Sequence, residues 1–170
     1  MSDLQGIARS KVEAELNSRL LALPAEVQAL QRQLSAKGQL MSGNMLRGVL
    51  RLGQESLQAQ GNAITTHYAW AVREALTASQ SWVQALAAEG ADSLAPLVTK
   101  ASDLVKDACQ LAKQPALSAR LLADLDSTHL RVRESIITSM DAEFAVKRRG
   151  LLRWLGSLFG RLLRLGATGP

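Results

Sequence analysis

The sequence predicts an all-α protein, an antiparallel helical bundle of four to six helices with a C-terminal amphipathic helix. The chain has 170 residues, of which 47% are hydrophobic, so it is long enough to bury one core. Aromatic residues make up only 4%, and the abundance of Ala, Leu, Gln and Arg favours helix over strand. Apolar residues recur at three- and four-residue steps, and no segment shows the sustained period-two alternation of a strand. We expect residues 1–146 to form the bundle and residues 147–170 to form a basic tail.

The first predicted helix covers residues 3–22. Its apolar stripe is made of Leu4, Ile7, Val12, Leu16 and Leu20. Pro24 is accepted in the first turn of a second helix over 24–37, because the proline lacks only an N–H that would be unpaired there. Gly38 is a suitable residue to end it. The pattern is equally compatible with one kinked helix over residues 3–37.

The third predicted helix covers residues 39–60 and contains glycine at every fifth position. These glycines are Gly43, Gly48 and Gly53. Each one weakens a helix by about 1 kcal/mol relative to alanine. We interpret them as sites of close helix packing rather than as marks of a mobile element. The Gly61-Asn62 pair is expected to end this helix.

Three further helices are expected, over residues 63–89, 92–113 and 116–146. The first has an apolar stripe of Ile64, Tyr68, Val72, Leu76, Val83 and Leu86. Gly90 and Asp92 form the next break, with Asp92 as the N-cap, and Pro115 the one after. The inward face of the last helix is expected to carry Leu117, Leu121, Leu125, Val132, Ile136, Met140 and Phe144. Gly150 marks the expected bend into the tail.

Residues 147–165 separate into two faces when they are placed on a helical wheel. Nine large apolar residues fall on one half: Leu151, Leu152, Trp154, Leu155, Leu158, Phe159, Leu162, Leu163 and Leu165. The opposite half carries Arg149, Gly150, Arg153, Gly156, Ser157, Gly160, Arg161 and Arg164. An apolar face with Trp and Phe opposite a cationic face is typical of a helix that lies in a membrane interface.

The net charge of +5 is concentrated in the tail. Residues 1–146 hold fourteen Lys/Arg and fifteen Asp/Glu, a net of −1, whereas residues 147–170 hold six Lys/Arg and no acid, a net of +6. This asymmetry predicts an anionic partner. The chain has no run of about 18 apolar residues, so we expect the tail to lie on a membrane rather than cross it. With one cysteine and no signal-peptide pattern at the N-terminus, we expect a cytoplasmic, peripheral membrane protein.

The predicted membrane-binding residues fall into two groups. Those expected to meet lipid phosphates are Arg149, Arg153, Arg161 and Arg164, and those expected to enter the acyl boundary are Leu151, Trp154, Leu155, Leu158, Phe159 and Leu162. The bundle would then act as an adaptor, a scaffold or a membrane-active effector, including one that permeabilises the membrane through oligomerised tails.

Two other interpretations of the tail stay open. It is either the last helix of the bundle, packed on the fold itself, or a helix that docks in a groove of a protein partner or a second copy, as in a soluble assembly subunit or cargo protein. The absence of acidic residues from its polar face, the three glycines that weaken it in water and the nine apolar residues in fifteen positions favour the membrane. Nucleic acid is not an expected partner, because it cannot bury so large an apolar face.

No catalytic residue, metal site or cofactor is predicted. Asp126 and His129 have the spacing of two ligands on one helix, but a di-metal bundle site needs further Glu and His residues. Cys109 has Val105 and Ala112 one turn away on either side and is expected to be a small core residue. The chain has no nucleophile elbow, no Walker loop and no dinucleotide-binding glycine motif. A non-catalytic protein is therefore expected.

Overall fold

The computed structural model describes residues 2–166, with side chains for residues 3–150, and this part of the chain consists of helices and the loops that join them, without strands. The elements are α1 (Ser2–Ala36), α2 (Gly43–Glu74), α3 (Gln80–Asp92), α4 (Ala95–Leu111), the short 3-10 helix η1 (Pro115–Leu117) and α5 (Ser118–Gly166). The expected all-α fold is confirmed.

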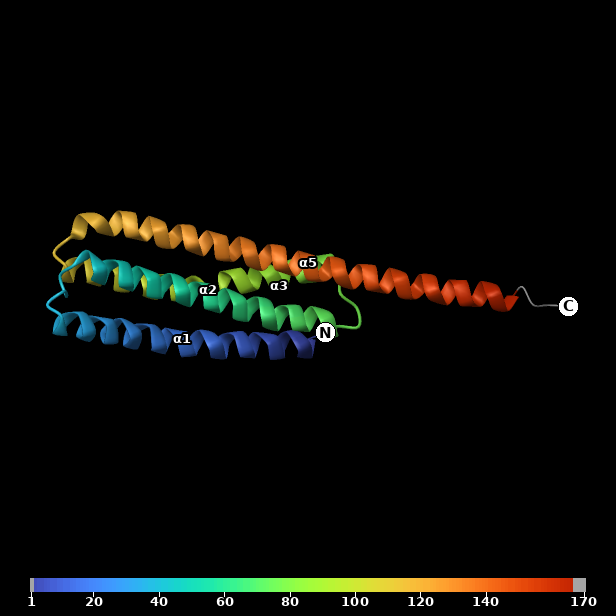
Figure 1. The fold of residues 1–170 in the computed structure, drawn as a ribbon. Coiled ribbons are helices and arrows are strands. Elements are labelled where there is room, and N and C mark those ends of the chain that lie inside the picture. Colours follow the sequence, from blue (N-terminus) through green and yellow to red (C-terminus); the bar gives the residue numbers. More distant parts are fainter. Residues whose placement is uncertain (1, 167–170) are drawn as a thin grey trace.

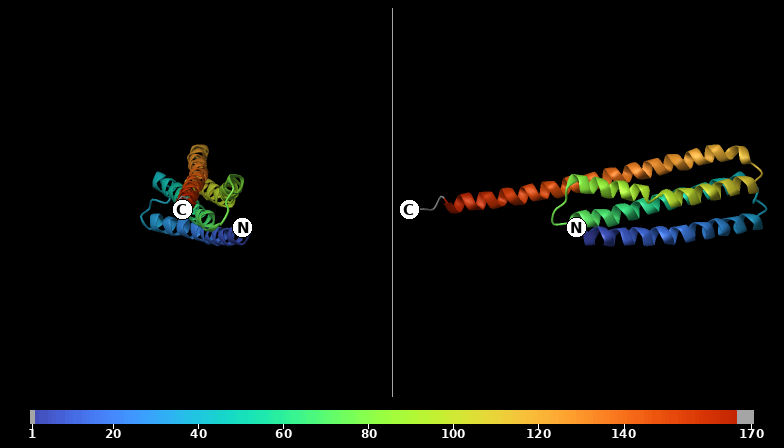
Figure 2. Two further views of the ribbon diagram at one scale, coloured as in Figure 1. Left: turned by 90° about the vertical axis from the view of Figure 1, so that its right-hand side faces the viewer. Right: turned by 180° about the vertical axis from the view of Figure 1, so that it is seen from behind.

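The helices form four antiparallel columns, because α3 and α4 follow one another along the same column (Figure 1). The view along the long axis in Figure 2 shows these columns grouped around a common interior. The start of α1, the end of α2 and the start of α3 lie together at one end of the bundle. Helix α5 leaves the bundle at this end, which we call the exit end.

The stretch expected as two helices or one kinked helix over residues 3–37 is one helix, since α1 (Ser2–Ala36) continues through Pro24. A proline inside a helix costs about 3 kcal/mol through its missing hydrogen bond and its ring. Leu23 and Val27, on either side of Pro24, are both buried in the core formed with α2, α4 and α5. Burial of two such side chains offsets that cost, at about 1.5–3 kcal/mol each.

The predicted helix end at Gly61-Asn62 is wrong, because α2 runs through both residues to Glu74. Gly61 is a packing residue: a Cβ added to it would overlap Cγ1 of Val132 on α5. Gly48 and Gly53 confirm the packing interpretation, since an added Cβ would lie 2.6 Å from Leu30 Cδ2 and 3.3 Å from Ala101 Cβ, respectively. The third of these glycines, Gly43, has open space around it.

The helix expected over residues 63–89 is divided between α2 and α3 by a loop, residues 75–79. Ser79 is the N-cap of α3, and its Oγ accepts a hydrogen bond of 3.2 Å from the backbone N–H of Trp82. Leu76, expected to face inward, lies in this loop and is 94% exposed. The next break is also displaced, because α3 contains Gly90 and ends at Asp92, the residue expected to begin the following helix. Gly90 is buried there because Ile64 and Tyr68 approach it closely.

The core consists of two apolar clusters, one at each end of the bundle, with polar residues between them. The exit-end cluster includes Val12, Ile64, Tyr68, Leu86, Val132, Ile136 and Met140. The other cluster includes Leu23, Val27, Met45, Leu57, Leu97, Val105, Cys109 and Leu125. Between them on α2, Gln60 is fully buried and its Nε2 donates to the carbonyl of Val12 at 3.1 Å. The inward face predicted for α5 is confirmed except at Leu117, which is 40% exposed.

Candidate membrane-binding helix

The tail begins where α5 passes the exit end of the bundle. Phe144 still packs against the exit-end cluster, whereas Val146 is 62% exposed and Arg148, Arg149 and Gly150 are all exposed. The bend expected at Gly150 is not present, since α5 is one helix to Gly166. Figures 1 and 2 show that α5 extends beyond the ends of the other helices.

Lys147 fixes the base of the tail to the C-terminal end of α2. Its Nζ donates to the carbonyl of Arg73 at 3.0 Å and also to the carbonyls of Val72 and Ala75. The last carbonyls of a helix have no partner within the helix and carry a partial negative charge, so an ammonium group is favourable there. Burial lowers the pKa of Lys147, and the nearby Glu74 opposes that shift. Lys147 therefore stabilises the bundle and is not one of the tail cations that remain available to an anionic partner.

We expect Lys147→Met to lower the free energy of unfolding by about 1–2 kcal/mol, because it removes a charged donor from the end of α2 and leaves the carbonyls there without it. Urea denaturation followed by circular dichroism measures the change. Arg148→Met is the matched control, since Arg148 is exposed and a change there is expected to stay within about 0.5 kcal/mol. Equal effects of the two substitutions would contradict this role for Lys147.

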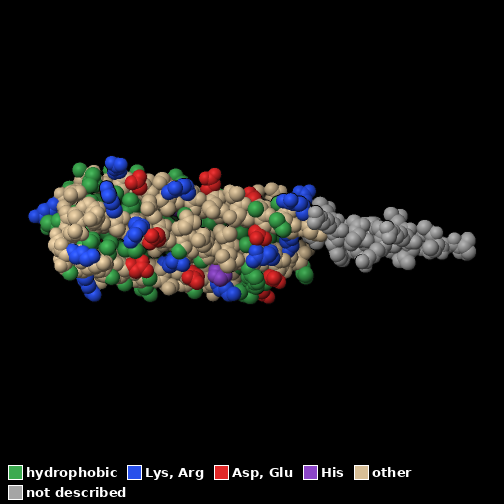
Figure 3. Space-filling model, in the orientation of Figure 1, with side chains coloured by type: hydrophobic (Ala, Val, Ile, Leu, Met, Phe, Trp, Pro, Cys, Tyr) green, Lys and Arg blue, Asp and Glu red, His purple; other side chains and the backbone are tan. Residues whose placement is uncertain are grey.

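Of the predicted membrane-binding residues, Arg149 has a described side chain, and it is exposed. The other nine lie outside the residues whose side chains are described: Leu151, Arg153, Trp154, Leu155, Leu158, Phe159, Arg161, Leu162 and Arg164. The backbone of these nine belongs to α5. Among the described side chains, cationic and acidic groups alternate over the face of the bundle in Figure 3, in keeping with its near-neutral sequence.

A polar cluster that the sequence did not reveal joins α1, α2 and α3 near the exit end. Arg9 donates two hydrogen bonds of 2.7 Å to the carboxylate of Glu89, and the Tyr68 hydroxyl donates to the same carboxylate at 2.8 Å. Gln5 bridges Glu89 and the indole N–H of Trp82, at 3.2 Å to each. The hydrogen bond from Arg9 outweighs burial and lowers the pKa of Glu89.

This cluster is suited to holding helices together rather than to proton transfer. Burial, followed by the hydrogen bond to Glu89, raises the pKa of Tyr68, so its hydroxyl stays protonated. A carboxylate with a lowered pKa that already accepts bonds from a guanidinium is a weak base. No single-sequence signal marks it, because Arg9 and Glu89 are 80 residues apart in the chain.

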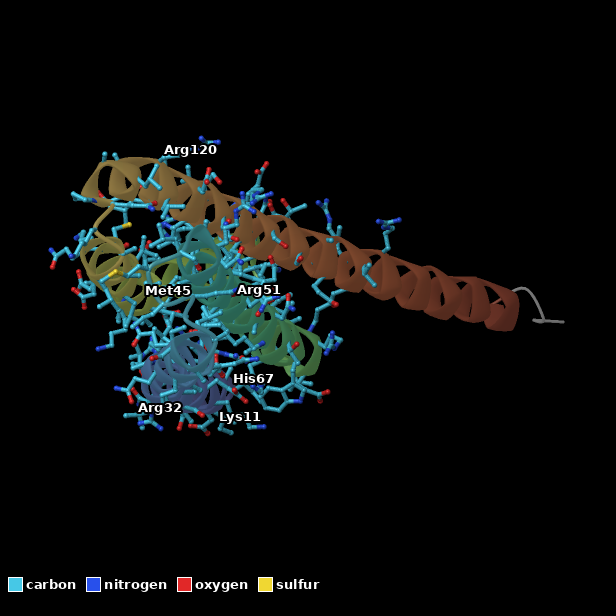
Figure 4. The ribbon with its side chains drawn as sticks, turned by 60° about the vertical axis from the view of Figure 1, so that its left-hand side comes forward. Lys11, Arg32, Met45, Arg51, His67 and Arg120 are labelled. Atoms are coloured by element: carbon cyan, nitrogen blue, oxygen red, sulfur yellow. The ribbon has the colours of Figure 1, made fainter. Side chains whose placement is uncertain are left out.

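Neither the histidines nor the cysteine belongs to a metal-ligating cluster in the described part of the chain. Among those residues, no three His, Cys, Asp or Glu side chains are close enough together to hold a metal ion. His67 lies beside Lys11 between α1 and α2 (Figure 4). Burial, and then Arg133, lower the pKa of His129. Cys109 is a buried core residue, as expected, and burial raises the pKa of its thiol.

Comparison with protein-family models, with curated protein sequences and with solved structures finds no match to this chain. Among the described residues, no helix combines the length and the apolar character needed to span a bilayer.

Proposed function

We propose that this protein is a non-catalytic helical protein that attaches to an anionic membrane or lipid surface through residues 147–165. The observation that carries the proposal is the course of α5, which continues beyond the exit end into the stretch whose sequence is apolar on one face and cationic on the other. Within the described part of the chain, no other helix lies beside this extension of α5 in Figure 1.

The charge and the apolar content of the tail support a reversible attachment. With Lys147 bonded to α2, five cations remain on the tail: Arg148, Arg149, Arg153, Arg161 and Arg164. Each contributes about 1 kcal/mol near an anionic leaflet, before screening and entropy are subtracted. Burial of most of the nine large apolar side chains contributes several kcal/mol more. Ordering of the tail offsets part of this sum.

In this proposal the bundle is an adaptor, a scaffold or an effector that the tail holds at a lipid surface. Acidic and basic side chains are mixed on the bundle, so its surface adds little net attraction to lipid. Membrane affinity should therefore depend on the tail, and substitutions on the bundle away from the exit end should leave it unchanged.

Co-sedimentation of the full chain with vesicles tests the proposal. We expect binding to vesicles that contain phosphatidylglycerol, weaker binding at high salt and little binding to phosphatidylcholine alone. Trp154→Asp should reduce the affinity for anionic vesicles at least about tenfold, because it places a charge among the residues predicted to enter the acyl boundary. Leu130→Asp is the matched control, since Leu130 lies on the bundle part of α5 and is 64% exposed.

Two outcomes would overturn the proposal. One is a full-length chain that ignores anionic vesicles at low salt. The other is binding that Trp154→Asp and Leu130→Asp reduce equally. Self-association of the free chain that is lost on Trp154→Asp, without vesicle binding, would assign the tail to a groove of a second copy instead. Release of a dye enclosed in the same vesicles distinguishes permeabilisation from attachment.

A further inference from the structure

Leu76, in the loop between α2 and α3, is more exposed than any other large hydrophobic residue whose side chain is described. Its exposed fraction is 94%, compared with 79% for Leu21, the next highest. The loop lies at the exit end, beside the point where α5 leaves the bundle (Figure 1). A single exposed leucine is common on protein surfaces, so exposure alone does not indicate a binding site, and its position in the fold must be considered as well.

The loop is tied directly to the base of the tail. Lys147 donates to the carbonyl of Ala75, the residue that precedes Leu76. Val146, next to Lys147 on α5, is also exposed, at 62%. Because the Lys147 contact joins loop and tail, whatever surface the tail binds also lies near Leu76.

Two exposed cations of the exit end line an open depression between α3 and α5. Its volume is about 430 Å³, and it is lined by Gln80, Asp141, Phe144, Ala145, Arg148 and Arg149. Arg148 and Arg149 are exposed. The nearby Glu143 is already bonded to Arg73 at 3.0 Å. The depression therefore combines the partly buried Phe144 with two cations and one carboxylate, Asp141, so its charged side chains sum to a net charge of +1.

The base of the tail carries Arg148 on the side of α5 that faces the bundle. Arg148 follows Phe144 by four residues, about one turn of an α-helix, so the two side chains share a face of α5. Phe144 packs against the exit-end cluster, so its direction is the direction of the bundle. A flat surface that approaches the base of the tail from this side meets the exit end before any other part of the bundle.

We propose that the exit end of the bundle is a second contact with the same anionic lipid surface, in which Leu76 enters the acyl boundary while Arg148 and Arg149 meet lipid phosphates. This inference rests on the proposed function of the tail. The inference adds an orientation to the proposed attachment. The bundle meets the membrane with the end at which α1 starts, and the loops at the opposite end point away.

Vesicle affinity of loop variants in the full chain tests the second contact. Leu76→Asp is expected to weaken binding to phosphatidylglycerol-containing vesicles about fivefold, while leaving the fold intact because the side chain is almost fully exposed. Leu21→Asp is the matched control: Leu21 is also highly exposed, but it lies on α1 about 28 Å along the helix from its exit-end start. Its affinity should match that of the unmodified chain.

A fluorescent label provides a second readout of the same contact. An environment-sensitive dye on Leu76→Cys should shift to shorter wavelength when vesicles are added, and the same dye on Leu21→Cys should not. Cys109 does not interfere, because it is buried and its pKa is raised.

The outcomes separate the two proposals. If Trp154→Asp abolishes binding while Leu76→Asp behaves like Leu21→Asp and the dye at position 76 does not shift, the second contact is wrong and the tail attachment stands. If the unmodified chain does not bind the vesicles at all, the proposed function itself fails.

Discussion

Gly61→Leu is expected to lower the free energy of unfolding by about 2 kcal/mol. Gly61 is buried where α2 crosses α5, and even a Cβ there would overlap Cγ1 of Val132. Val132 is itself buried, and a β-branched side chain in a helix has one strongly preferred rotamer, so it cannot turn away. Extra methylene groups in a packed core cost about 1–3 kcal/mol or more, which exceeds the gain of about 1 kcal/mol in helix propensity.

Urea denaturation of Gly61→Leu and Gly6→Leu measures this effect against a matched control. Gly6 lies in α1, and a Cβ added to it would meet no atom within 4 Å, so leucine there should raise stability by about 0.5–1 kcal/mol. Val132→Ala in the Gly61→Leu background should recover part of the loss, because it removes the atom that overlaps. A neutral Gly61→Leu would mean that α2 and α5 do not approach as described.

Glu89→Ala is expected to lower the free energy of unfolding by about 2 kcal/mol, because it leaves the buried hydroxyl of Tyr68 without the carboxylate that accepts its hydrogen bond. The exposed pair of Arg51 and Glu55 supplies the control, and Glu55→Ala should change stability by less than about 0.5 kcal/mol. In a double-mutant cycle, Tyr68→Phe should remove most of the cost of Glu89→Ala, since no unpaired hydroxyl then remains.

The contribution of Glu89 should also depend on pH. The hydrogen bond from Arg9 lowers the pKa of Glu89 in the folded state, so folding favours the ionised carboxylate. Its stabilisation is complete above the unfolded pKa, about 4.3, and is lost as the pH falls through the lower folded value. The difference in stability between the unmodified chain and Glu89→Gln should therefore be constant near neutrality and shrink below about pH 4. A difference that does not vary with pH would contradict the described pairing.

Helix type and apolar stripes could be predicted from the sequence because both depend on local spacing. Boundaries could not, as Gly61 and the loop at residues 75–79 show. The same residue type, glycine, ends some helices and lets others pack closely, and only the neighbouring Val132 on α5 decides which applies. The real break, residues 75–79, contains neither glycine nor proline, and the capping residue Ser79 alone is too weak a signal to place it.

The same distinction applies to the candidate membrane-binding helix: its local pattern could be predicted, whereas its contacts with distant residues could not. The two faces of residues 147–165 follow from sequence period alone, whereas the role of Lys147 depends on a helix end more than 70 residues earlier in the chain. The charge count groups Lys147 with the tail cations, but its three carbonyl partners on and after α2 assign it to the bundle. The cluster around Glu89 could not be predicted, because its members are drawn from three helices.

The close fit of α5 against α2 has a mechanical consequence. These helices are parallel and side by side, since Gly53 lies against Leu125 and Gly61 against Val132, and α5 leaves along the long axis of the bundle. A force that pulls on the tail would therefore act in shear, and α5 would have to slide past the interlocked Gly61 and Val132 before any contact could open. Rupture of this kind resists load better than the residue-by-residue peeling of a helix pulled sideways, so the contact between α2 and α5 is suited to bearing a pull along the bundle axis.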